Sequence, residues 1–218
     1  MKNGIKTLCA GLAVLGVAAG AGHATDLNQA PDAIIEQISD DLLTDLDQNR
    51  EFYRQNQAAL EESVRQHFLP AIDMPFASRL ILGRETRNLK PAQVDEFATA
   101  LSDLLIRRYA EALLDFKSRD QMKTLPLVAG QSDKMTRVRT RVRLNTGVET
   151  PVDYIFRKTP QGWMVFDVVI EGISYVTTYR NQFGEEIRRD GFDAVLERVR
   201  KGEVETDFSK DKDAGDDA

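Results

Sequence analysis

The stretch from Trp163 to Gly191, WMVFDVVIEGISYVTTYRNQFGEEIRRDG, decides the fold. Its first eight residues, 163–170, contain one polar side chain, Asp167. Both alternating faces of a strand over these residues are therefore apolar, which indicates a central strand covered on both sides. After Glu171-Gly172 the apolar residues recur at steps of three and four, at Ile173, Val176, Tyr179, Phe183 and Ile187. This spacing predicts a helix that packs back on the sheet, with an apolar space between them.

Three more strands are predicted upstream, near residues 121–129, 134–145 and 148–157. Turn sequences at 145–147 and 159–162 join them as hairpins, so we expect an antiparallel meander. The strand over 134–145 alternates apolar residues with a row of four arginines, Arg137, Arg139, Arg141 and Arg143. This row could dock an acidic partner or phosphate head groups, or it could be a solvated face with cross-strand ion pairs.

Helical spacing predicts two helices within 31–69, the second near 50–66, and a short apolar helix that stops at Gly83. The longest helix is expected over about 91–117, and a last short one follows Gly191. The apolar face of the longest helix is wider than a surface helix needs. The extra apolar residues could be ordinary core or the wall of an apolar cavity.

Residues 1–24 have the pattern of a signal peptide: two lysines, an uncharged apolar run and small residues at 22–24. Removing this segment takes away the single Cys and one of the two His, and changes the formal charge from −6 to −8. We expect an exported chain with one domain over 25–202 that is stabilised by its core without disulfides. Residues 203–218 are expected to form an acidic disordered tail. The acidic charge argues against nucleic acid as a partner.

The sequence contains no G-x-S-x-G, H-E-x-x-H or P-loop motif and no paired cysteines. Carboxylates in or beside the apolar strands remain as candidates for chemistry: Asp153, Asp167 and Glu171. A buried carboxylate can serve as a general base in the cavity of a cone-shaped α+β enzyme. Alternatively, these acids are exposed or paired with the arginines of the neighbouring strand.

The chain resembles the MlaC family, also called the toluene-tolerance family, over residues 31–201. The most specific part is W-x-V-x-D-V-x-x-E-G-I-S at 163–174, followed by a helix with Gln182 and Phe183. The stretches LPAIDMPFASRLILG at 69–83 and LLIRRYAEALL at 104–114 also carry the resemblance. It implies an α+β fold in which helices pack on a curved antiparallel sheet of four to five strands, similar to an NTF2-like cone, around an apolar lipid cavity.

The resemblance also implies a function: a monomeric periplasmic phospholipid carrier, not an enzyme, with no cofactor and with phospholipid as its cargo. Its implied partners are an outer-membrane lipoprotein–porin complex and an inner-membrane ABC transporter with an MCE component. Shuttling lipid between them would maintain the lipid asymmetry of the outer membrane. Two other functions stay open, namely a cavity enzyme that uses a buried carboxylate, and an adaptor with a solid core that works through the arginine face.

For a carrier, we expect lipid to contact apolar side chains from the helices and strands around the predicted space. These candidates are Met74, Phe76, Leu80, Phe97, Leu101, Leu105, Tyr109, Val142, Tyr154, Phe156, Val165, Val168, Ile173, Val176 and Tyr179. None of them is expected to be catalytic, and no metal ligand is expected.

Overall fold

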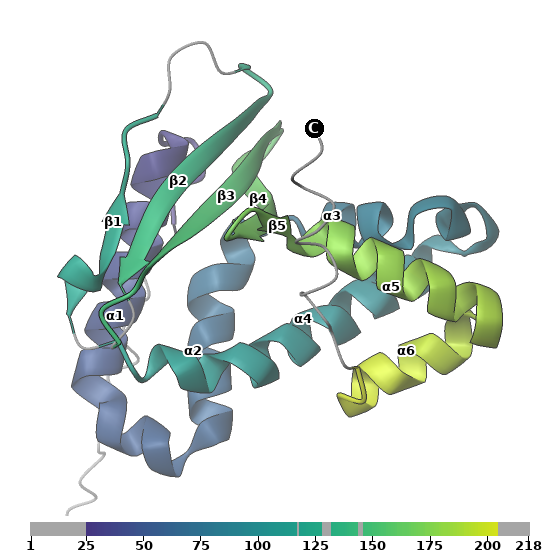
Figure 1. The fold of residues 1–218 in the computed structure, drawn as a ribbon, viewed down its shortest axis with the longest axis horizontal. Coiled ribbons are helices and arrows are strands. Elements are labelled where there is room, and N and C mark those ends of the chain that lie inside the picture. The colour runs from purple at the N-terminus through teal and green to yellow at the C-terminus, as the bar shows by residue number, and fades with distance from the viewer. Residues whose placement is uncertain (1–24, 117, 128–131, 144–145, 205–218) are drawn as a thin grey trace, which may run out of the picture.

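The computed structural model describes residues 25–116, 118–127, 132–143 and 146–204 (Figure 1). The predicted signal peptide lies outside the described residues, as does the tail from residue 205 onward. The described α-helices are α1 (Pro31–Gln55), α2 (Gln57–Phe68), α3 (Met74–Leu82), α4 (Pro91–Leu113), α5 (Tyr175–Asp190) and α6 (Phe192–Lys201). The strands are β1 (Met122–Thr124), β2 (Met135–Arg143), β3 (Glu149–Thr159), β4 (Gly162–Ile170) and β5 (Ile173–Ser174). Short 3-10 helices η1 (Leu69–Ala71), η2 (Gly83–Asn88) and η3 (Arg119–Gln121) join them.

The strands form one antiparallel meander in the order β1-β2-β3-β4-β5, which confirms the predicted fold class. The β3–β4 hairpin turns through Pro160 and Gln161, because Thr159 pairs with Gly162. A bulge interrupts the β3–β4 pairing: Phe156 lies opposite Val165, whereas Ile155 lies opposite Asp167. The extra residue in β4 changes the alternation, as expected for a bulge.

The bulge corrects the predicted faces of β4. Strict alternation places Val165 and Val168 on opposite faces, but the register places both on the face that carries Phe156 and Tyr154. The prediction that β4 is a central strand holds for only part of its length, because β3 pairs along one edge and the other edge is paired at a few residues. β5 pairs with β4 only at Val169 and Ile170, and a parallel bridge from Ile72 reaches it at Val165.

Helix α1 covers one face of the sheet, which we call the inner face. Ile34, Ile35 and Ile38 pack there with Val138 of β2 and Phe156 of β3. A second cluster joins α1, α2 and α4, and a third fills the space among α3, α4, α5 and α6. In Figure 1 the sheet and α1 lie to the left and α3, α5 and α6 to the right, while α4 runs from one group to the other.

The start of α5 is fixed by polar side chains. The Ser174 hydroxyl accepts a hydrogen bond from the Thr177 amide (3.0 Å) and donates one to Asp167 Oδ2 (2.6 Å). The Val176 amide donates to Asp167 Oδ1 (3.0 Å). The helix therefore begins at Tyr175, and Ile173 belongs to β5 rather than to the helical stripe that we predicted.

Other boundaries differ from the predictions by a few residues. The break between the first two helices lies at Asn56 rather than near residue 50, and α4 ends at Leu113 rather than at 117. The packed part of the chain extends at least to Val204, which is 3 % exposed, although we predicted a tail without packing from residue 203. Arg108 of α4 donates to the Val204 carbonyl. Within the described part of the chain, no helix has the length and apolarity needed to cross a membrane.

Candidate functional site

The inner face of the sheet is sealed along β2 and only partly covered along β3 and β4. Each residue of β2 on this face, from Thr136 to Val142, is buried. Tyr154 of β3 pairs with Val138 of β2 and with Val168 of β4, so the three form one row across the inner face. In this row Tyr154 and Val168 are only half-buried. Val152 and Ile170 form the next row and are also half-buried. Helix α1 therefore closes one side of the inner face and leaves apolar surface on the other.

Tyr154 lies deep in the molecule although part of its surface remains accessible. Burial raises the pKa of its phenol to about 12, because the charged phenolate is poorly solvated there. Tyr154 thus keeps accessible surface at the margin of the cluster between α1 and the sheet.

A second set of half-buried apolar residues comes from α4 and α5. Leu105, Tyr175 and Val176 pack at the margin of the cluster formed by α3 to α6. Tyr109 is 36 % exposed, and its ring centroid lies 6.2 Å from that of Tyr175. Burial raises the pKa of Tyr109 to about 12 and also raises the pKa of Tyr175. These residues surround the start of α5, where the chain leaves β4.

An apolar groove lies among α2, α3 and α4. It has a volume of about 520 Å³ and is lined by Leu69, Ile72, Met74, Pro75 and Ala98, with polar residues of α2 and α4 at its margin. Met74, one of the predicted lipid contacts, therefore borders this groove. An ion pair between Arg65 and Asp103 joins α2 to α4 beside it.

The predicted lipid contacts divide into two groups by burial. Four are at most 1 % exposed: Phe97, Leu101, Phe156 and Tyr179. Three others are nearly as buried: Val142, Val165 and Ile173. The half-buried or exposed group consists of Met74, Phe76, Leu80, Leu105, Tyr109, Tyr154, Val168 and Val176. Only this second group has surface to offer a ligand.

Phe76 lies at the edge of the sheet and not on its inner face. The Arg157 guanidinium stacks on its ring at 4.1 Å, and the Phe166 ring meets it edge-on at 5.2 Å. Arg157 also pairs with Asp73, the residue that caps α3 by accepting from the Phe76 amide (3.1 Å). These contacts give Phe76 a role in attaching α3 to β4.

The carboxylates that we considered for catalysis do not lie on the inner face. Asp153 lies opposite Val169, and Asp167 lies opposite Ile155, in rows that alternate with the inner-face rows. Asp167 accepts the two hydrogen bonds that start α5, and burial raises the pKa of its carboxyl. Glu171 is exposed in the turn before β5, where its φ is 51°. The geometry gives Asp167 a structural role.

Ion pairs with strand β3 and with η3 occupy part of the arginine face. Arg137 lies 3.6 Å from Asp153, and Arg143 lies 3.8 Å from Glu149 and from Asp120. Arg139 and Arg141 stand between them on the same face of β2, which is the face turned away from α1. Among the described residues, no group of three or more His, Cys, Asp or Glu side chains could hold a metal ion.

The family model described as MlaC protein matches residues 36–201. The chain belongs to the MlaC family. The matched range begins in α1 and ends with the last residue of α6, so it includes the whole sheet and both sets of half-buried residues.

Relatives of this MlaC-family chain cover most of its length. The toluene tolerance protein Ttg2D of Pseudomonas putida is 27 % identical over 194 residues, which cover 88 % of this chain and 85 % of that protein. The intermembrane phospholipid transport system binding protein MlaC of Haemophilus influenzae is 23 % identical over 176 residues, or 79 % of this chain and 81 % of that protein.

A solved structure has the same fold as this MlaC-family chain. It is the phospholipid-binding protein from Ralstonia solanacearum in complex with a phospholipid. The two structures match with a TM-score of 0.72 and 27 % identity, over 80 % of this chain and 97 % of that one.

Sequence reasoning missed three residues of the half-buried sets: Val152, Ile170 and Tyr175. Val152 precedes Tyr154 by two residues in β3, so the strand period alone could have found it. Ile170 was obscured by the bulge in β4. Tyr175 lies off the helical stripe, and its partner Tyr109 is distant in sequence, so no local pattern marks it.

Proposed function

We propose that the protein is a phospholipid carrier that buries acyl chains between the inner face of β3–β4 and the start of α5 with the facing part of α4. The observation that carries this proposal is the pair of half-buried apolar surfaces, Tyr154 and Val168 on the sheet and Leu105 and Val176 on the helices. They lie at the margins of two separate clusters. The phospholipid-binding protein from Ralstonia solanacearum, which has this fold and is 27 % identical, holds a phospholipid, and this supports lipid as the occupant.

The energetics of lipid transfer explain why a carrier is needed. Exposing an acyl chain to water costs about 0.8 kcal/mol per CH₂. Two chains of about 15 carbons therefore cost on the order of 20 kcal/mol, and free diffusion of lipid through water is negligible. Burying the chains reversibly breaks no covalent bond, so this function requires no catalytic group.

The proposed setting is the periplasm, reached through a signal peptide at residues 1–24. In this setting a monomer would shuttle phospholipid between an outer-membrane lipoprotein–porin complex and an inner-membrane MCE-containing ABC transporter, which maintains the lipid asymmetry of the outer membrane. Delivery requires a docked state that holds lipid less tightly than the free state. Arg139 and Arg141, with their ion-paired neighbours Arg137 and Arg143, are the proposed docking face for an acidic surface of such a partner.

The experiment compares Val176→Glu with Thr177→Glu. Val176 is half-buried on the proposed wall, whereas the neighbouring Thr177 is exposed. The two variants add the same charge to the same helical turn and differ only in whether that charge lies on the wall. After purification, bound phospholipid is extracted and quantified by mass spectrometry. We expect Val176→Glu to lose its lipid and Thr177→Glu to keep it.

Circular dichroism and urea unfolding establish that both variants fold. A folded Val176→Glu variant that retains wild-type lipid would contradict the proposed wall. Leu105→Gln places a polar group on the facing helix and gives an independent result if Val176→Glu proves unstable.

A further inference from the structure

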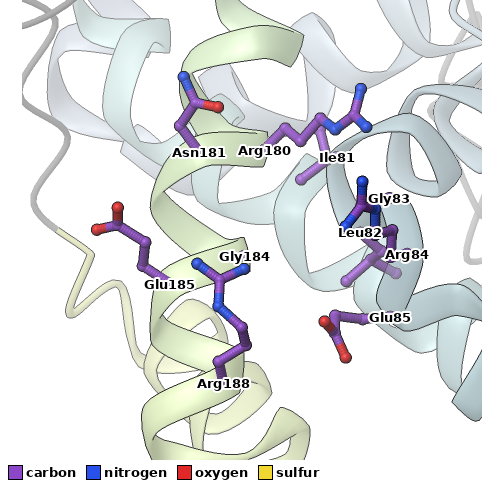
Figure 2. A pocket seen from close by; sticks show the side chains of 10 residues that line it. All are labelled: Ile81, Leu82, Gly83, Arg84, Glu85, Arg180, Asn181, Gly184, Glu185 and Arg188. Carbon is purple, nitrogen blue, oxygen red and sulfur yellow. The ribbon is translucent and has the colours of Figure 1, made fainter.

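A second hollow lies between the end of α3 and the middle of α5, away from the apolar surfaces described above. Its volume is about 580 Å³, and its lining includes three arginines, Arg84, Arg180 and Arg188. Arg84 comes from η2, and the other two come from α5 (Figure 2). Two acids, Glu85 and Glu185, also line it.

The three arginines of this groove lack the ion pairs that neighbouring arginines have. Arg198 of α6, for example, forms ion pairs with both Glu186 and Asp190 of α5, each at 2.8 Å. Within the described ranges, by contrast, no ion pair joins Arg84, Arg180 or Arg188 to a carboxylate. The lining therefore carries three positive charges against the two negative charges of Glu85 and Glu185, and guanidinium groups that pair with neither acid favour binding of an anion.

Two glycines shape the groove. Gly83 has a φ of +54°, a backbone conformation that residues with a side chain rarely adopt, and a Cβ there would lie 3.2 Å from Arg180 Nε. Gly184 lies inside α5, where a Cβ would lie 3.5 Å from Arg188 Nη1. Each guanidinium group therefore lies close to the backbone of a half-buried glycine. Glycine inside a helix costs about 0.5–1 kcal/mol relative to alanine, so the bare backbone at Gly184 has an energetic cost.

We propose that this groove binds a phosphate group. Guanidinium groups bind phosphate through paired, charge-assisted hydrogen bonds, and the several oxygens of a phosphate can accept from more than one arginine at once. A carboxylate ligand fits less well, because its two oxygens can both be bound by a single guanidinium, which leaves the other arginines unpaired. The ligand is either the head group of an anionic lipid or a soluble phosphate ester. The groove shares no residue with the proposed acyl-chain surfaces, so the proposal stands independently of the carrier function.

The test uses the full chain as purified, at low ionic strength. Inorganic phosphate and glycerol 3-phosphate are titrated while NMR follows the arginine Nε–Hε signals. Co-sedimentation with phosphatidylglycerol vesicles and with phosphatidylcholine vesicles forms the second arm. The variants are Arg84→Gln, Arg180→Gln and Arg188→Gln. Arg87→Gln is the matched control, because Arg87 is exposed in the same 3-10 helix as Arg84 and does not line the groove.

We expect phosphate or glycerol phosphate to shift the signals of the three groove arginines, and each groove variant to weaken binding about five- to tenfold. If the wild type binds phosphatidylglycerol vesicles and the groove variants do not, the phosphate belongs to a lipid head group. If the wild type binds only inorganic phosphate or glycerol 3-phosphate, the ligand is a soluble phosphate. Absence of binding in both arms would overturn the proposal. An equal loss in Arg87→Gln would also overturn it, because the effect would then follow net charge alone.

Discussion

At the scale of single residues, Asp167 attaches α5 to β4 through two hydrogen bonds, from Ser174 and from the Val176 amide. Burial disfavours its charged form by more than these bonds favour it, so the pKa of its carboxyl is raised above the ordinary value of 3.8. The folded protein therefore holds the proton more tightly than the unfolded chain does. The stability that Asp167 contributes is present below the unfolded pKa and is lost as pH rises through the folded pKa.

This linkage predicts the pH dependence of the Asp167→Asn variant. Asparagine stays neutral, so the unfolding free energy of the wild type minus that of the variant should fall as pH rises from about 3 to about 7. Urea unfolding of both proteins across this range measures the difference. A difference that stays constant or increases with pH would show that the carboxylate is not desolvated.

The contrast between Phe97 and Leu105 of α4 predicts a difference in stability. Phe97 is fully buried, with ring centroids 5.4 Å from Phe183 and 6.3 Å from Phe192. Phe97→Ala should lower the unfolding free energy by about 3–5 kcal/mol, because it leaves a cavity in a filled cluster. Leu105 is half-buried, and Leu105→Ala should cost about 1–2 kcal/mol in lipid-free protein. Equal costs in urea unfolding would show that Leu105 is ordinary core.

The sequence could not separate these two kinds of residue. Phe97, Leu101 and Leu105 recur on one stripe of α4, and helical spacing identifies the covered face. Spacing does not tell whether protein or ligand covers a given position. That depends on which neighbouring elements reach it, and those elements are distant in the chain.

At the scale of elements, the β3–β4 hairpin depends on the absence of a side chain at Gly162. Its φ is +124°, and a Cβ there would lie 2.3 Å from the Leu27 carbonyl oxygen. The same carbonyl accepts a hydrogen bond from the Trp163 amide (2.7 Å). The hairpin is thereby fixed to the segment that precedes α1.

A matched pair of glycine variants tests this attachment. Gly162→Ala should lower the unfolding free energy by about 3 kcal/mol or more, since strain at positive φ adds to a clash with backbone. Gly147→Ala, in the β2–β3 connection, has a φ of +83° and open space around it, so it should cost about 1–2 kcal/mol. Thermal and urea unfolding measure both. A Gly162→Ala variant no less stable than Gly147→Ala would contradict the described approach of Leu27.

Most elements were predictable because local chemistry defines them. Pro91 begins α4, Gly83 ends α3, and the period of two marks β2. The bulge in β4 was not predictable. Its extra residue, Phe166, has no residue opposite it in β3, but it continues the apolar run and so looks like any other strand residue in the sequence. The bridge from Ile72 to Val165 joins segments far apart in the chain and has no local signature either.

At the scale of the whole molecule, the buried residues of the described chain form distinct clusters, one between α1 and the sheet and another among α3 to α6. A domain of this size usually has one continuous core with smaller satellites. The half-buried margins of these two clusters come from the sheet and from α4–α5. Apolar surface of this kind is stabilised if another apolar group covers it, and an acyl chain is such a group.

Native mass spectrometry of the mature protein from its own cells, with organic extraction of bound material, tests the carrier function most directly. We predict a mass that exceeds the polypeptide by stoichiometric phospholipid, and extraction should recover that lipid and identify its chains and head groups. A mass equal to the bare polypeptide, with nothing extractable and no uptake from vesicles, would contradict the account and leave a protein with a solid core.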